Sequence, residues 1–128
     1  MPAAKIYGHR PPTYTDLVVA IVARTLRDHP RLNSSLVDGS GGAEVAEWQE
    51  INVGVAVALD NGLVVPVIRD ADRKGVFDLA RELTEISKAA RDKKLKPGDM
   101  QGGTFSISSL GGIGGTYFTP IINAPEVA

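Results

Sequence analysis

Cysteine is absent from this sequence of 128 residues, which excludes disulfides, thiolate metal sites and a cysteine nucleophile. The sequence also lacks an excess of either charge, because 14 Lys and Arg residues are balanced by 15 Asp and Glu residues. This balance gives no reason to expect nucleic acid or an anionic membrane as the main partner. No apolar run approaches the ~20 residues that span a bilayer, and residues 1–10 lack the apolar core of a signal peptide. We therefore expect a soluble intracellular protein.

Histidine is scarce, with only His9 and His29 in the chain. His29 directly precedes Pro30 at an expected helix end, where a capping role is the ordinary explanation, and His9 lies in a weakly patterned segment. Two isolated histidines do not make a metal site, so we expect none. A serine–histidine–acid nucleophilic site has little support for the same reason.

The sequence does contain enough apolar residues, 43% of the total, for one domain with a real core. Its coarse order of helix, strands, helix and strands predicts an α/β fold, a two-layer domain with a mixed sheet. Residues 1–12 are weakly patterned, and we expect a poorly ordered N-terminal segment there. The domain itself is expected over residues 13–128.

Two segments have the apolar period of helices. The first follows residues 13–16, which offer helix N-caps, and it should end before Pro30, which cannot continue a helix. Its apolar stripe is wide, so we expect this helix to be well buried. The second helix is expected from residue 76 to about residue 95. Its apolar residues lie on one face: Val76, Leu79, Leu83, Ile86 and Ala90.

Two apolar runs predict a pair of strands in the middle of the chain. Residues 51–59 predict the first strand, residues 60–62 a hairpin turn, and residues 63–68 the second strand. The runs are nearly continuous, which predicts burial on both faces. Pro66 predicts an edge or irregular position within the second strand. Residues 31–36 are expected to form a short ordered link.

The stretch 101–115 combines an alternating strand, the adjacent hydroxyls of Ser108 and Ser109, and a glycine-rich loop. Glycines allow a backbone or ligand to approach closely, and hydroxyls at a strand end can donate to a substrate oxygen. The loop lacks the Gly-Lys-Ser/Thr ending and the glycine spacing of nucleotide sites, which argues against phosphate binding. On spacing alone, a tight strand connection and a ligand site are equally good interpretations. Neighbouring strand residues point to opposite faces, so at most one serine enters a given site.

Three stretches resemble, in order and spacing, the catalytic domain of the dihydrolipoamide acyltransferases, the E2 core component of the 2-oxo acid dehydrogenase complexes. They are residues 29–35, residues 52–74, and residues 101–112 followed by 118–128. The resemblance covers nearly everything from Thr13 onward. It implies a chloramphenicol-acetyltransferase-like fold, here incomplete, in which helices flank a mixed sheet. It also implies homotrimers that build a larger core.

The resemblance implies acyl transfer between dihydrolipoamide and coenzyme A. In the family a histidine is the general base on the attacking thiol, and a serine hydroxyl stabilises the oxyanion. Ser108 matches that serine. The positions of Thr13, Ser87, Ser108 and Ser109 match residues that contact coenzyme A in relatives. An aspartate makes a further contact in many relatives, but Ala58 occupies its position, so we expect that contact to be absent.

The family's catalytic histidine belongs to an Asp-His-Arg-x-x-Asp-Gly motif, which residues 1–128 do not contain. Neither His9 nor His29 aligns with it, so we expect this chain alone to be inactive. The alternative is a non-catalytic assembly or scaffold module of the E2 core type. The resemblance leaves acetyl, succinyl and branched-chain acyl groups open.

The resemblance also implies partners and a compartment. A lipoyl group would be supplied by a separate domain or chain, and the dehydrogenase components of the complex would be further partners. Such complexes lie in the cytoplasm of bacteria or in the mitochondrial matrix of eukaryotes.

Overall fold

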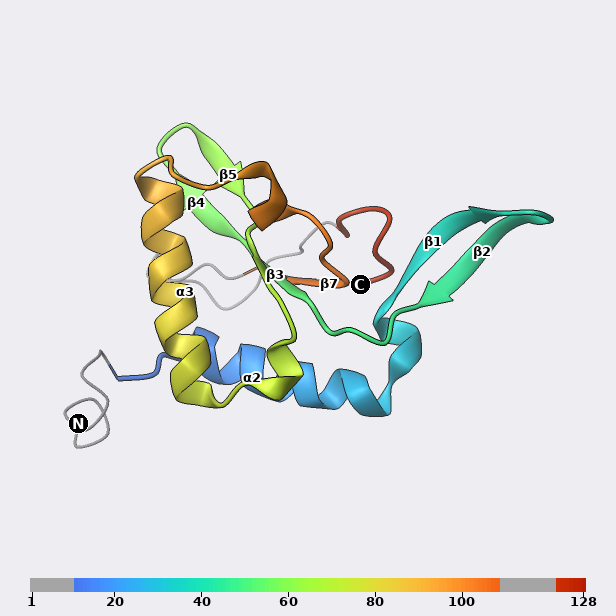
Figure 1. Cartoon of the computed structure of the whole chain (residues 1–128), viewed down its shortest axis with the longest axis horizontal. Helices are drawn as coiled ribbons and strands as arrows, with labels where there is room; N and C mark the ends of the chain where they lie inside the picture. Colours follow the sequence, from blue (N-terminus) through green and yellow to red (C-terminus); the bar gives the residue numbers. More distant parts are fainter. Residues whose placement is uncertain (1–10, 109–121) are drawn as a thin grey trace.

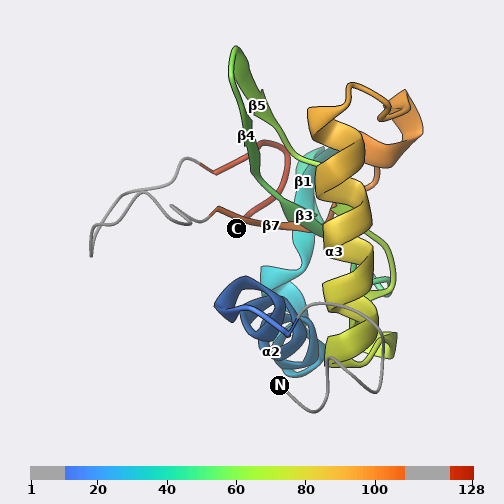
Figure 2. The ribbon, with the colours of Figure 1, turned by 90° about the vertical axis from the view of Figure 1, so that its left-hand side faces the viewer.

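A computed structural model describes residues 11–108 and 122–128. Its two α-helices, α2 (Tyr14–Asp28) and α3 (Val76–Arg91), form one layer of the molecule. Both pack against a small central sheet, with α2 along its lower side and α3 beside it (Figures 1 and 2). This arrangement confirms the two-layer α/β class.

The central sheet has three strands in the order β6-β3-β7. β3 (Val53–Val55) lies in the middle, antiparallel to β6 (Val67–Ile68) and parallel to β7 (Phe105–Ile107). The sheet is therefore mixed, as predicted. All three residues of β7 pair with β3, and Ser108 is the first residue after this paired segment.

Two hairpins extend from this centre (Figure 1). The first, β1 (Ser34–Gly39) with β2 (Gly42–Glu47), projects far from the body of the molecule. Its first strand begins inside the segment predicted as a link, so that prediction is wrong from Ser34 onward. The second hairpin is β4 (Val57–Leu59) with β5 (Gly62–Val64), and its two-residue loop confirms the predicted turn. Three short 3-10 helices complete the chain: η1 (Pro30–Leu32), η2 (Ala71–Arg73) and η3 (Pro97–Met100).

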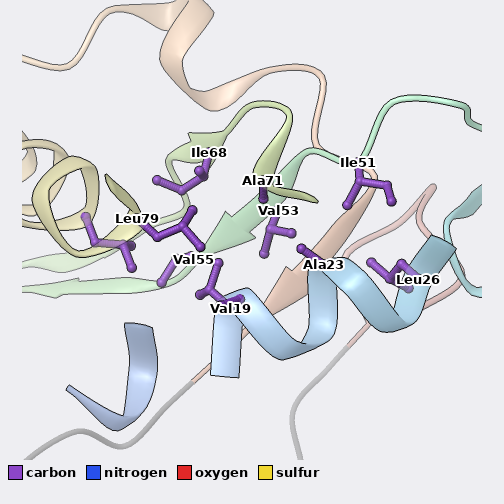
Figure 3. Packing of buried hydrophobic residues seen from close by; sticks show 11 residues of the cluster. Val19, Ala23, Leu26, Ile51, Val53, Val55, Ile68, Ala71 and Leu79 are labelled. Atoms are coloured by element: carbon purple, nitrogen blue, oxygen red, sulfur yellow. The ribbon is translucent and has the colours of Figure 1, made fainter. Parts of the chain in front are cut away.

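The core lies between the helices and one face of the central sheet (Figure 3). Val53 and Val55 are two residues apart in β3, so both side chains lie on the same face and point toward α2. Figure 3 shows them against side chains of α2, α3 and β6, all buried. These include Val19, Ala23, Leu26, Ile68 and Leu79.

The start of α2 and the end of α3 are each fixed by nearby residues. Thr13 and Asp16 form a capping box at the start of α2: the Thr13 N–H donates to Asp16 Oδ2 at 2.7 Å, and the Asp16 N–H donates to Thr13 Oγ1 at 3.3 Å. α3 ends at Arg91, earlier than predicted. Lys93 adopts a left-handed conformation with φ of 57°, and the Lys94 N–H donates to the Ala89 carbonyl at 2.8 Å. This is the Schellman pattern that stops a helix.

The predicted strand over residues 51–59 is divided at Ala56 into β3 and β4. The Ala56 N–H donates to the Ile107 carbonyl at 3.0 Å, while Pro66, opposite, has no N–H with which to continue the pairing. The irregular position predicted for Pro66 is thus confirmed. Burial on both faces holds for β3, whereas the β4–β5 hairpin is largely exposed, with Leu63 at 63%.

Helix α2 is buried on one side only, so the prediction of a well-buried helix is wrong. Val19, Ala23 and Leu26 point into the core. The opposite side carries a second apolar stripe that no described residue covers. Its members are Tyr14, Leu17, Val18 and Ile21, exposed by 89%, 43%, 43% and 62%.

Gly54 allows β3 to approach Val65 and Ser106 closely. It points away from the helices and pairs with Ser106 across β3 and β7. A Cβ atom placed there would lie 2.9 Å from Val65 Cγ1 and 3.3 Å from Ser106 Oγ. Any side chain at this position therefore has to push β7 or Val65 aside.

We predict that Gly54→Ala lowers the free energy of unfolding by about 1–3 kcal/mol, the usual cost of an overpacked site. Gly98→Ala is the matched control, because a Cβ atom there meets nothing within 4 Å. Urea denaturation of both variants measures the difference. Equal stabilities would show that the close approach at Gly54 is not a constraint.

Candidate functional site

Ser108 lies one residue beyond the end of β7. Phe105 and Ile107 pack against the core, so the alternation of the strand turns Ser106 to the opposite face, and we expect Ser108 to follow it there. Ser108 is exposed, and its hydroxyl has no hydrogen-bond partner among residues 11–108 and 122–128. A free hydroxyl at a strand end is available to donate to a ligand.

A buried polar network fixes the start of β7. Thr104, Asn52 and Asn33 are all nearly inaccessible to solvent. Thr104 Oγ1 accepts from the Asn52 N–H at 3.0 Å and donates to Asn33 Oδ1 at 2.5 Å, while the Thr104 N–H donates to the Asn52 carbonyl at 2.7 Å. The hydroxyl thus satisfies a donor and an acceptor that would otherwise be buried without partners.

The two asparagines extend this network to neighbouring segments. Asn33 Nδ2 donates to the carbonyls of Trp48 and Glu50, at 3.0 and 2.9 Å. Asn52 Nδ2 donates to the Gly102 carbonyl at 3.0 Å, and Asn52 Oδ1 accepts from the Asp70 N–H at 3.0 Å. The network therefore joins the approach to β7 to the segments before β3 and after β6.

Arg69 binds the backbone of the segment that precedes β7. Its Nη2 donates to the carbonyls of Gly98 and Gln101, at 2.8 and 2.7 Å. A Cβ atom at Gly102, whose φ is 80°, would lie 2.8 Å from Arg69 Nη1. Gly102 is thus required both for its positive φ and for the contact with Arg69.

Glu126 is a carboxylate beside the face that carries Ser108. Its Oε1 accepts from Ser106 Oγ at 2.6 Å. Residues 122–128 reach this place by joining β1: the Leu36 N–H donates to the Pro125 carbonyl at 2.9 Å, and the Val127 N–H donates to the Ser34 carbonyl at 3.1 Å. Sequence reasoning missed Glu126, because only the fold brings it to a strand 20 residues earlier.

The other predicted site residues lie elsewhere. Thr13 is the N-cap of α2, and Ser87 is half-buried on α3. Both belong to the helix layer, whereas we expect Ser108 on the opposite face of the sheet, so the described residues do not join the three in one site. Ser109 and the glycines 111–115 lie outside the described residues.

A cavity of about 380 Å³ lies between the tip of the β4–β5 hairpin and the end of α3. Ala58 lines it, together with the cationic side chains of Arg91 and Lys93. In the described part of the chain, neither cation forms an ion pair. Ser87 precedes Arg91 by four residues and therefore lies on the same side of α3. Ser87, which the resemblance assigns to coenzyme A, therefore lies one helical turn from a residue that lines this cavity.

Two kinds of feature are not found in the part of the chain that the structure describes. Across residues 11–108 and 122–128, no three His, Asp or Glu side chains are grouped so that they could hold a metal ion. None of the described helices has the length and apolar character needed to cross a membrane.

We predict that Thr104→Val lowers the free energy of unfolding by about 1–3 kcal/mol, because Asn33 Oδ1 and the Asn52 N–H lose their partner in the interior. Thr104→Ser, which keeps the hydroxyl, should restore most of the loss. Thermal and urea unfolding measure both variants. A serine variant as unstable as the valine variant would contradict the role given to the hydroxyl.

Comparison with known proteins shows the family of this chain. The family 2-oxoacid dehydrogenases acyltransferase (catalytic domain) matches residues 3–128. The chain is 56% identical over 112 residues to the dihydrolipoyllysine-residue acetyltransferase component of the pyruvate dehydrogenase complex of Cupriavidus necator. It is 52% identical over 111 residues to that of Haemophilus influenzae. These matches cover 88% and 87% of the chain but 19% of each relative, so the chain spans about a fifth of their length.

Solved structures show the same fold. The chain is similar to dihydrolipoamide acetyltransferase from Azotobacter vinelandii, whose study concerns a serine, a histidine and an asparagine in its catalytic mechanism (TM-score 0.89, 42% identity). It is also similar to the cubic core of the pyruvate dehydrogenase multienzyme complex (TM-score 0.89, 43% identity). Each match covers 98% of this chain and 50% of the solved one. The predicted chloramphenicol-acetyltransferase-like fold is thus confirmed, over about half of a catalytic core. The chain belongs to the family of 2-oxoacid dehydrogenase acyltransferase catalytic domains.

Proposed function

We propose that Ser108 is the oxyanion-stabilising residue of an acyltransferase site that moves an acyl group between dihydrolipoamide and coenzyme A. The observation that carries this proposal is the position of Ser108. It directly follows a strand of fixed register, is exposed, and has no partner among the described residues. The family to which the chain belongs supports the reaction, and the Azotobacter vinelandii relative supports a serine in its mechanism.

In this reaction, Ser108 would act as a hydrogen-bond donor. When the thiol of coenzyme A attacks the thioester carbonyl of the acylated dihydrolipoamide, negative charge develops on the carbonyl oxygen. Ser108 would donate a hydrogen bond to that oxygen, and the bond strengthens as the charge grows. The tetrahedral intermediate then expels the dihydrolipoamide sulfur and leaves the acyl group on coenzyme A. A preorganised donor of this kind contributes roughly 10²–10³ to the rate.

The base that takes the thiol proton would come from outside these 128 residues. His29 is exposed at the end of α2, in the helix layer, and so cannot serve the face that carries Ser108. His9 lies outside the described residues. The chain matches about half of the solved cores, and we place the histidine base in the other half.

Coenzyme A would bind with its phosphates near the cavity beside α3. Arg91 and Lys93 supply positive charge there, without ion-pair partners in the described residues. Ser87, one helical turn away, can add a hydroxyl. The Thr13 hydroxyl oxygen already accepts from the Asp16 N–H, and its O–H can still donate to a ligand.

The lipoyl group would come from another domain or chain, and the catalytic unit would be a homotrimer that builds a larger core. The multienzyme core among the similar structures supports such an assembly. The alternative is a non-catalytic assembly module. Such a module would keep the surfaces that assemble the core but would not require the Ser108 hydroxyl.

We predict the effect of Ser108→Ala in a completed core, made by joining to Ala128 the half of the Cupriavidus necator core that this chain does not match. Acetyl transfer from acetyl-dihydrolipoamide to coenzyme A should fall by roughly 10²–10³ in kcat. The KM for coenzyme A should change little, because the bond strengthens mainly in the transition state.

Ser106→Ala is the matched control. Ser106 lies in β7, two residues before Ser108, and its hydroxyl already donates to Glu126. Its replacement should change kcat far less. Equal losses in the two variants, or no loss in Ser108→Ala, would contradict the role of Ser108, and the second result would favour the assembly module.

A further inference from the structure

Helix α2 carries an apolar stripe that the rest of the described chain leaves uncovered. Tyr14, Leu17, Val18 and Ile21 follow the spacing i, i+3, i+4 and i+7, which places them on one side of a helix. All four are exposed, from 43% to 89%. The stripe is bounded at its C-terminal end by Thr25, whose hydroxyl donates to the Ile21 carbonyl at 2.8 Å.

The opposite side of the same helix already lies in the core. Val19, Ala23 and Leu26 are buried to within a few per cent, against the central sheet and η2. A helix that is apolar on both sides is typical of one that is covered on both sides. One of the two covers is therefore not among residues 11–108 and 122–128.

The stripe has the dimensions of a helix contact. Its four residues span about two turns, roughly 10 Å at 1.5 Å per residue, and rows of this spacing pack against the grooves of a second helix. A stable contact between separate proteins usually takes about 20–30 residues on each side. Four side chains are too few for that, but they suit packing inside one domain.

The comparisons indicate where the missing cover lies. This chain superimposes on solved catalytic cores over 98% of its length but accounts for 50% of theirs. A similar length of each of those chains therefore lies outside the matched half. We propose that the α2 stripe is covered by the apolar face of a helix from the half of the catalytic core that these residues do not match. The proposal concerns a packing surface and does not depend on the role of Ser108.

Single cysteines provide a direct test, because the chain has none of its own. Ile21→Cys is made in the 128-residue chain and in the completed core described above, with the cysteines of the added half replaced by serine. The rate of maleimide labelling is compared with that of each chain in urea. Ser40→Cys, in the exposed loop between β1 and β2, is the control for access of the reagent.

We expect position 21 to label freely in the 128-residue chain and about tenfold more slowly, or slower still, in the completed core. The control should label freely in both. Equal labelling of position 21 in the two proteins would overturn the proposal. Protection in the 128-residue chain that rises with its concentration would also overturn it, because a second copy would then be the cover.

A second comparison does not need the cysteine. Val18→Lys should leave the melting temperature of the 128-residue chain nearly unchanged, since this side chain is exposed there, and should lower that of the completed core. If the joined chain does not fold, the two halves are co-expressed as separate chains, and Val18→Lys should prevent their co-purification. Co-purification unaffected by Val18→Lys, or no association of the unmodified halves, would contradict the proposal.

Discussion

The pairing of β7 with β3 is the constraint on which the rest of this structure depends. Thr104, just before β7, exchanges hydrogen bonds with Asn52, just before β3, and the Ala56 N–H donates to the Ile107 carbonyl at the other end. The register between these two points cannot slip by one residue without turning Ser106 and its neighbours to the opposite face. A buried polar network is costly to leave half satisfied, so it specifies one arrangement of the strand.

This register divides the sheet into two faces with different tasks. Val53, Val55, Phe105 and Ile107 belong to the helix side and make the core. The other side begins with Gly54, which has no side chain, and continues to Ser106 of β7 and to Glu126. The hydrophobic core is thus concentrated on one face, and polar side chains gather on the other. The uncovered stripe of α2 lies on neither face of the sheet. We therefore propose that a further part of the domain covers it.

Local features were predictable from the sequence. The capping box of Thr13 and Asp16, the end of α2 before Pro30 and the hairpin loop before Gly62 each depend on a few adjacent residues. The end of α3 was not predictable, because a lysine rarely adopts the left-handed conformation found at Lys93. Nothing in the apolar pattern could show which side of α2 would be covered.

The candidate site was predictable only in part. The resemblance identified Ser108 from an intact motif, and its role stays a prediction. The polar network was not foreseen, since Asn33 and Thr104 lie 71 residues apart and meet only in the fold. Glu126 was missed for the same reason. Thr13 and Ser87 remain predictions, because the described residues do not join them to Ser108.

The central claim is that these 128 residues carry one half of an active site, the oxyanion donor, while the base lies in the other half of the core. Its most direct test is the rate of acetyl transfer from acetyl-dihydrolipoamide to coenzyme A by the purified 128-residue chain, with and without the histidine-bearing half. The account predicts no turnover above the uncatalysed rate for the chain alone, and turnover that saturates with coenzyme A once both halves are present. Saturable turnover by the 128-residue chain alone would contradict it.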